Sequence, residues 1–150
     1  MDDAEFMREA LAEAEKALAA GEMPVGCVIA RGGEILARAH NEREAAGDPT
    51  AHAEVLAIRR AAKALGSWRL DGCALYVTLE PCPMCAGAIS QARISRLVYG
   101  ADDPAYGCAG SVYRIPEDPA LNWFCPCDGG VLAEACASLM RVFFAQKRKS

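Results

Sequence analysis

The chain has 150 residues, of which 53% are hydrophobic, and a formal net charge of −4 at pH 7. We expect residues 1–150 to form one domain, because this length and apolar content suffice for a single core. The acidic balance excludes a protein that holds nucleic acid by overall positive charge, so such a contact needs a local basic patch. The chain shows neither a secretory signal nor an apolar run long enough for a bilayer, which predicts a soluble, cytoplasmic protein without membrane partners.

The first part of the chain predicts a helix followed by a hairpin of two strands. Residues 3–20 carry apolar side chains at helical spacing between Glu and Lys. The short runs 25–30 and 34–39 are apolar or alternating, and Gly32 and Gly33 between them can adopt the positive φ of a tight turn. We therefore expect two antiparallel strands after the first helix.

The rest of the chain alternates between helical and strand patterns. Residues 73–79 are strongly apolar and include Tyr76, Val77 and Thr78, which suits a central strand buried on both faces. In chain order we expect a polar loop at 41–48, a helix from a Thr50 cap to Ala64, the strand at 73–79, a helix over 83–92, a strand at 95–99, a loop at 100–110, an unpatterned stretch to Gly130 and a helix over 131–147. The order predicts an α/β protein with three layers, α/β/α, around a mixed sheet of about five strands.

Two short motifs, His52-Ala53-Glu54 and Pro81-Cys82-Pro83-Met84-Cys85, point to a metal site. One imidazole and two thiolates suit Zn²⁺, and three ligands leave the fourth position open, as in a catalytic zinc site. Cys82 and Cys85 lie one turn apart at the start of a predicted helix, whose positive end is expected to lower the pKa of both thiols. His-X-Glu followed by Pro-Cys-X-X-Cys is the signature of zinc nucleobase deaminases.

The spare carboxylate of Glu54 predicts the chemistry. Zinc lowers the pKa of water enough to make a nucleophile near neutral pH, and Glu54 can move protons from that water to the ring and to the departing amine. A fourth cysteine could instead close the zinc site and make it structural, although this leaves His-Ala-Glu unexplained. The available cysteines are Cys27, Cys73, Cys108, Cys125, Cys127 and Cys136, all expected to be reduced thiols.

Several other residues have less specific interpretations. Cys125-Pro126-Cys127 could bind a second metal, but small buried side chains near a turn explain it better. His40 is expected to be a surface or structural residue, and Trp68 and Tyr76 to pack in the core. The cations at the C-terminal end, Arg141, Lys147, Arg148 and Lys149, fit either a solvated helix end or a phosphate-binding strip for RNA.

The chain resembles the bacterial tRNA-specific adenosine deaminase family over nearly its whole length. The segments that carry the resemblance are 24–26, Asn41 with Arg43-Glu44, 48–54, 75–82, 84–88 and 107–111. The resemblance implies a cytidine-deaminase-like fold, a homodimer, one zinc ion per subunit, and conversion of the wobble adenosine of a tRNA anticodon stem-loop to inosine. It also implies that Asn41 hydrogen-bonds the base and that the backbone at Ala53 lies in the pocket.

Two segments depart from the family pattern. The loop Asp102-Asp103-Pro104-Ala105-Tyr106 lacks a basic residue that the family often has, and Asn122-Trp123-Phe124 stands where the family commonly has Asn-His-Arg. Asp103 and Asn122 still match and are predicted RNA contacts. Tyr106 and Trp123 could replace the missing contacts by stacking on unpaired bases.

Two other functions remain open at this point. A deaminase of free bases or nucleosides, such as guanine or cytosine deaminase, shares the metal motif and the fold. A non-catalytic RNA-binding or dimerisation subunit could keep the fold without activity, but it would not need Glu54 together with every metal ligand.

Overall fold

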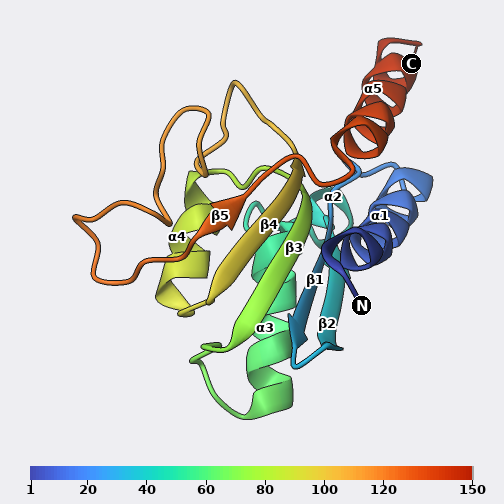
Figure 1. Cartoon of the computed structure of the whole chain (residues 1–150). Helices are drawn as coiled ribbons and strands as arrows, with labels where there is room; N and C mark the ends of the chain where they lie inside the picture. The colour runs from blue at the N-terminus through green and yellow to red at the C-terminus, as the bar shows by residue number, and fades with distance from the viewer. Residues whose placement is uncertain (150) are drawn as a thin grey trace.

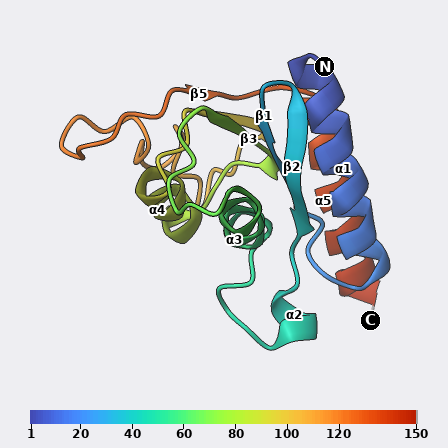
Figure 2. The same cartoon turned by 90° about the horizontal axis from the view of Figure 1, so that it is seen from below.

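The computed structural model describes residues 1–149, which form one five-stranded sheet flanked by helices (Figure 1). The helices are α1 (Asp3–Ala19), α2 (Arg43–Ala46), α3 (Ala53–Leu65), α4 (Pro83–Gln91) and α5 (Ala133–Lys149), and the strands are β1 (Gly26–Arg31), β2 (Glu34–His40), β3 (Cys73–Leu79), β4 (Arg96–Ala101) and β5 (Cys127–Asp128). Helices α1 and α5 cover one face of the sheet, and α3 and α4 cover the other (Figure 2). The expected α/β fold with three layers is confirmed.

The sheet has the order β2-β1-β3-β4-β5 and is mixed. β1 is antiparallel to both β2 and β3, whereas β3, β4 and β5 run parallel to one another. The hairpin between β1 and β2 turns at Gly32 and Gly33, whose φ angles of 58° and 84° suit glycine. α4 makes the crossover between the parallel strands β3 and β4, as parallel pairing requires.

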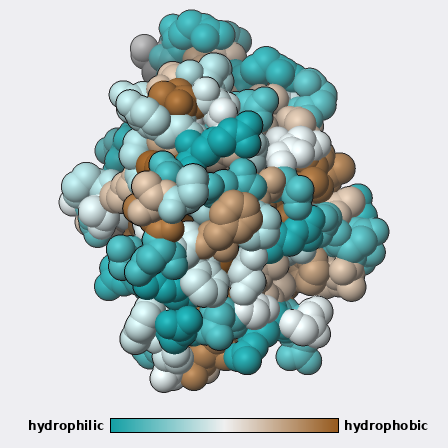
Figure 3. Space-filling view, turned by 60° about the vertical axis from the view of Figure 1, so that its left-hand side comes forward, coloured by the Kyte–Doolittle hydropathy of each residue, from teal (hydrophilic) through white to brown (hydrophobic). Residues whose placement is uncertain are grey.

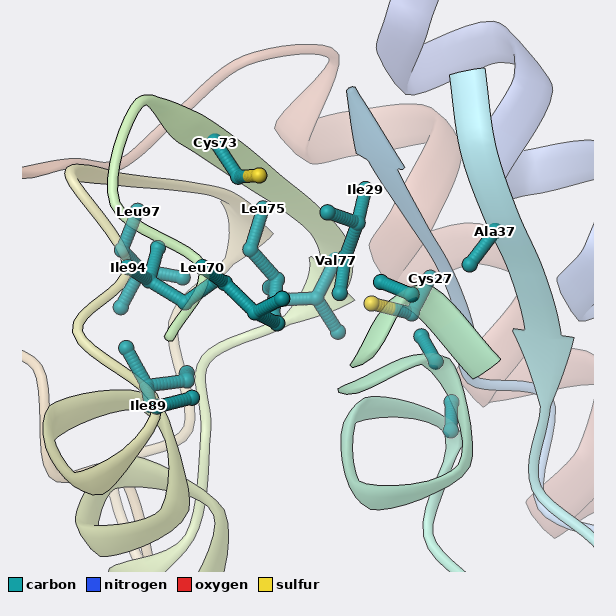
Figure 4. Close-up of a cluster of buried hydrophobic side chains, with 14 of the residues drawn as sticks. Cys27, Ile29, Ala37, Leu70, Cys73, Leu75, Val77, Ile89, Ile94 and Leu97 are labelled. Carbon is teal, nitrogen blue, oxygen red and sulfur yellow. The ribbon is translucent and has the colours of Figure 1, made fainter. Parts of the chain in front are cut away.

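The strand β3 separates two hydrophobic clusters because its side chains alternate between the faces of the sheet. Leu75 and Val77 point toward α3 and α4, where they pack with Ile29, Ile89 and other buried residues (Figure 4). On the opposite face, Tyr76 stacks on Phe6 of α1 with ring centroids 4.8 Å apart. Residues 73–79 were expected to form a strand buried on both faces, and they do. Tyr76 packs in the core as expected.

α1 lies very close to the sheet at Gly26. A Cβ atom at this position would overlap with backbone atoms of Ala10 and Ala14, so only glycine permits the approach. Asp2 caps α1 by accepting a hydrogen bond from the Glu5 amide at 2.8 Å, within a complete capping box. The helix expected over residues 3–20 is therefore confirmed, and it packs closely against the sheet.

Two expectations about the fold were wrong, and one of the expected five strands had not been located in the sequence. The segment 41–48 is not all loop, because Arg43–Ala46 forms the short helix α2. The stretch before Gly130 contains β5, whose two residues are too few to show an alternating pattern. Trp68 is not in the core, since 62% of it is exposed and its ring stacks with the guanidinium groups of Arg69 and Arg93.

On the face shown in Figure 3, hydrophobic residues form small, separate patches among hydrophilic ones. Within residues 1–149, no helix combines the length and the hydropathy that crossing a bilayer requires.

Candidate metal centre and pocket

The starts of α3 and α4 carry the three predicted metal ligands. His52 and Cys82 are the N-cap residues of these helices, and Cys85 lies in the first turn of α4 behind Pro83. Neither N-cap side chain makes a capping hydrogen bond, so both are free to face the space between the helices. The expected Thr50 cap was wrong, because the Thr50 hydroxyl donates to Asp48 at 2.8 Å and α3 starts at Ala53 with His52 as its N-cap.

The ligand atoms are spaced as a zinc ion requires. His52 Nδ1 lies 3.6 Å from Cys82 Sγ and 3.5 Å from Cys85 Sγ, and the three atoms are within 4.8 Å of one another. Tetrahedral zinc with ordinary bond lengths to nitrogen and sulfur would separate these atoms by about 3.5 Å. Among residues 1–149, no additional cysteine or carboxylate joins the group, so the alternative of a fourth cysteine ligand has no support.

Charge within the site also favours a cation. Hydrogen bonds from the Cys85 thiol and from His52 lower the pKa of Cys82 to about 4. The hydrogen bond that Cys85 gives to Cys82, together with burial, raises the pKa of Cys85 far above its usual value. Without a metal ion only Cys82 therefore has a lowered pKa, because the two neighbouring thiols share one proton and a second negative charge beside the first would be repelled. A divalent cation between them removes that repulsion, and zinc fits the donor set.

Glu54 lies beside this group in the first turn of α3 and is only 4% exposed. Burial raises the pKa of its carboxyl group to about 7, and the negative charge of Cys82 acts in the same direction. The carboxylate does not belong to the metal-ligand group. A buried carboxyl group with a pKa near neutrality can both accept and release a proton.

A cavity of about 600 Å³ opens onto these residues, a size typical of ligand pockets. Asn41 and Ala53, the two residues for which the resemblance implied contact with the base, both line it. Asn41 is 7% exposed, its Oδ1 accepts the Arg43 amide at 3.1 Å, and its Nδ2 contacts the Met23 carbonyl at 3.4 Å. The complete lining is Met23, Val25, Asn41, Arg43, Pro49, His52, Ala53, Glu54, Leu79, Glu80, Cys82, Pro83, Met84, Asp103 and Tyr106.

The predicted RNA contacts are distributed unequally around the molecule. Asp103 and Tyr106 line the cavity, and Tyr106 is 68% exposed. Asn122 is exposed but does not line the cavity. Trp123 is half-buried, and its indole N–H donates to the Ile94 carbonyl at 2.8 Å, so the ring contributes to the fold.

The C-terminal cations lie on α5, which covers the other face of the sheet from α3 and α4 (Figure 2). Arg141 pairs with Glu134, Lys147 lies over the Phe143 ring, and Arg148 is exposed. None of these cations lines the cavity.

Sequence reasoning missed Glu80 as a pocket residue. It is 2% exposed and its carboxylate accepts several hydrogen bonds from the loop after β4. The available signal was an acidic residue directly after a strongly apolar strand, in the run Glu80-Pro81-Cys82. His40, in contrast, is half-buried with Nδ1 3.4 Å from Glu13, as expected for a structural residue.

Comparisons with known proteins agree with this site. Residues 1–101 match the family described as the cytidine and deoxycytidylate deaminase zinc-binding region. The tRNA-specific adenosine deaminase of Bacillus subtilis (strain 168) is 49% identical over 144 residues, which cover 96% of this chain and 89% of the relative.

Two solved structures are also similar. One comes from a study of A-to-I editing by tRNA:A34 deaminases at the wobble position of transfer RNA. It has a TM-score of 0.87 and 44% identity, and the match covers 90% of this chain and 98% of that one. The other is guanine deaminase from Bacillus subtilis, with a TM-score of 0.65 and 45% identity over 68% of this chain and 66% of that one.

Proposed function

The chain belongs to the tRNA-specific adenosine deaminases, within the cytidine and deoxycytidylate deaminase family, and on that premise we propose that it converts adenosine at the wobble position of tRNA anticodons to inosine. The observation that carries this proposal is the His-Cys-Cys ligand group beside a buried, uncoordinated carboxyl group in one cavity. The reaction consumes one water and releases ammonia.

The residues that would hold zinc are His52, Cys82 and Cys85. Bound there, zinc supplies a Lewis acid that makes water nucleophilic at neutral pH. Glu54 takes a proton from the attacking water and delivers it to a nitrogen of the adenine ring. It then takes the remaining proton from the newly added hydroxyl group and gives it to the departing amine, which leaves as ammonia. Its burial beside the ligands, without coordination, leaves the carboxyl group available for both transfers.

Substrate binding requires the wobble base to leave the anticodon stack and enter the cavity. Asn41 and the backbone at Ala53 hold the base at the inner wall, and Asp103 and Tyr106 meet the RNA at the outer wall. Tyr106, highly exposed at the cavity, is suited to stacking on a flanking base. Asn122, Arg141, Lys147 and Arg148 are weaker candidates that would contact RNA beyond the cavity.

The same proposal includes the domain organisation, the oligomeric state and the cellular location of the protein. Residues 1–150 act as a single deaminase domain, the protein forms a homodimer, and it works in the cytoplasm on the tRNA anticodon stem-loop. The relatives named as tRNA-specific adenosine deaminases support tRNA as the substrate.

A deaminase of free bases is the second candidate, and the similarity to guanine deaminase from Bacillus subtilis favours it. Ammonia release separates the two. The zinc-loaded protein is incubated with tRNA carrying adenosine at the wobble position and, separately, with guanine, cytosine and free adenosine. We expect release from the tRNA alone, and release from a free base without tRNA turnover would contradict the proposal.

A further inference from the structure

The loop that follows β4 forms one wall of the cavity and lies above the start of α4 (Figure 1). Residues 102–111, here called the wall loop, include no residue of a named helix or strand. Two of its residues, Asp103 and Tyr106, line the cavity. Because the wall loop lacks a regular hydrogen-bonding ladder, its conformation must be set by other contacts.

Glu80, directly after β3, supplies several of those contacts. Its carboxylate accepts hydrogen bonds from the amides of Asp103 at 3.0 Å, Ala109 at 3.0 Å and Ser111 at 2.9 Å, and from the Ser111 hydroxyl. The donors come from both ends of the wall loop, so one side chain closes it. Glu80 itself is held in place, since its own amide donates to the Ala101 carbonyl at 2.9 Å.

The interior of the wall loop depends on this closure. The Asp103 carboxylate accepts the amides of Ala105 and Tyr106, each at 3.1 Å, and the Asp103 carbonyl accepts the Gly107 amide at 2.8 Å. Asp103 thus connects the Glu80 carboxylate to the turn that presents Tyr106. A displacement of Asp103 would move the Tyr106 ring at the cavity.

Gly107 shows how closely the wall loop fits around the carboxylate. A Cβ atom there would overlap with the Glu80 carboxyl group and with the Asp103 carbonyl. Gly107 is buried, so the added methyl group could not turn out to solvent without moving the loop. The contact between the wall loop and the Glu80 carboxyl group can therefore be disturbed by a substitution at Glu80 or by one at Gly107.

We propose that Glu80 is a positioning residue that acts through the wall loop, setting where Asp103 and Tyr106 meet the RNA. The part of this inference that concerns RNA rests on the proposed function. Glu80 takes no part in the proton transfers, which belong to Glu54, and it does not join the metal-ligand group.

The test replaces one acceptor with a group of nearly the same shape. In Glu80→Gln the amide keeps one oxygen acceptor but turns an NH₂ group toward two donors. We expect the amides of Asp103, Ala109 and Ser111 to exchange hydrogen about tenfold to a hundredfold faster, because a hydrogen bond to a charged group is lost or weakened. Single-amide exchange measured by NMR on the zinc-loaded protein reports this even if the protein does not act on tRNA.

Steady-state kinetics on tRNA test the effect of Glu80 on function. For Glu80→Gln we expect KM for tRNA to rise about tenfold with kcat changed by less than about threefold and with zinc content at the wild-type value. Gly107→Ala should reproduce both effects. Ser111→Ala, which removes only the hydroxyl donor, should show a smaller version of them and remains informative if Glu80→Gln does not fold.

Glu22 provides a matched control. It is also buried, and its carboxylate accepts the amides of Glu44 at 3.0 Å and Ala45 at 2.7 Å at the start of α2. Glu22→Gln should accelerate exchange at those two amides and leave the wall loop protected. Unchanged protection of the wall loop in Glu80→Gln, a fall in kcat at constant KM, or loss of zinc would each overturn the positioning role.

Discussion

The metal-ligand group and the wall loop face the same cavity but are held in different ways. The ligands lie at helix starts that backbone hydrogen bonds fix, from Leu56 to the His52 carbonyl at 3.0 Å and from Ala86 to the Cys82 carbonyl at 2.9 Å. The wall loop is instead held by the side chain of Glu80, which accepts hydrogen bonds from both of its ends, together with one backbone hydrogen bond from the Cys108 amide to the Pro81 carbonyl at 2.8 Å. The difference teaches that chemistry and RNA contact depend on separate parts of the structure, so mutations should affect them separately.

The largest effect is expected from a change in the ligand group. Cys82→Ser removes one of two sulfur ligands, and we expect loss of zinc and at least about a thousandfold loss of turnover. Metal content per chain and inosine formation are measured on the same sample. Cys127→Ser, at a half-buried cysteine outside the ligand group, is the control. Retained zinc with normal turnover in Cys82→Ser would remove Cys82 from the site.

The next effect separates metal binding from proton transfer within the same region. Glu54→Ala should keep about one zinc per chain and lose about 10²- to 10⁴-fold in kcat, the usual contribution of a general acid and base. The measurement combines metal analysis with single-turnover kinetics on tRNA. Turnover close to wild type in this variant would show that the proton path does not pass through Glu54.

A smaller effect tests the wall loop side of the comparison. Tyr106→Ala removes an exposed ring at the cavity, and we expect KM for tRNA to rise about fivefold or more through lost stacking while kcat stays near wild type. Tyr113→Ala is the matched control, because Tyr113 is 63% exposed but does not line the cavity. Equal effects of the two substitutions would mean that the wall loop has no special part in RNA binding.

The smallest effect lies outside both regions. Asp3 of α1 receives two hydrogen bonds from Arg96 at 2.8 and 2.7 Å, and these hold the pKa of its carboxyl group below the usual 3.8. A lowered folded-state pKa contributes stability that is present above the unfolded value and is lost as the pH falls through the folded value. Asp3→Asn should cost about 1 kcal/mol at pH 7, since the pair is more than one third exposed and partly screened.

Urea unfolding at pH 7 and near pH 2 measures this contribution. The difference between wild type and Asp3→Asn should shrink at the lower pH, and KM and kcat measured at pH 7 should equal those of the wild type. A stability difference that grows as the pH falls would have the wrong sign for this carboxylate.

The sequence predicted the ligand group better than its surroundings. His52, Cys82 and Cys85 could be identified because residue type and spacing follow directly from metal coordination, and helix starts bring such motifs together. The wall loop follows no repeat, since its conformation depends on a side chain 23 residues or more away along the chain. For the same reason β5 was missed, because its pairing with β4 depends on tertiary contacts rather than on a local pattern.

The position of aromatic side chains was also only partly predictable. Trp68 and Trp123 are the same residue type, yet Trp68 is exposed, whereas the Trp123 indole donates to the Ile94 carbonyl and packs against the core. Burial of a single tryptophan depends on how the loops around it fold, which periodicity does not report. Tyr76, within a long apolar strand, had enough local context to be placed correctly.

The most direct test of the account is the identity of the wobble base after treatment of tRNA with the protein. Inosine is detected as an A-to-G change by sequencing, and protein with one zinc per chain is compared with the same protein after chelation. The account predicts conversion confined to the wobble adenosine and dependent on zinc. No conversion by the zinc-loaded protein, or equal conversion by the metal-free protein, would contradict it.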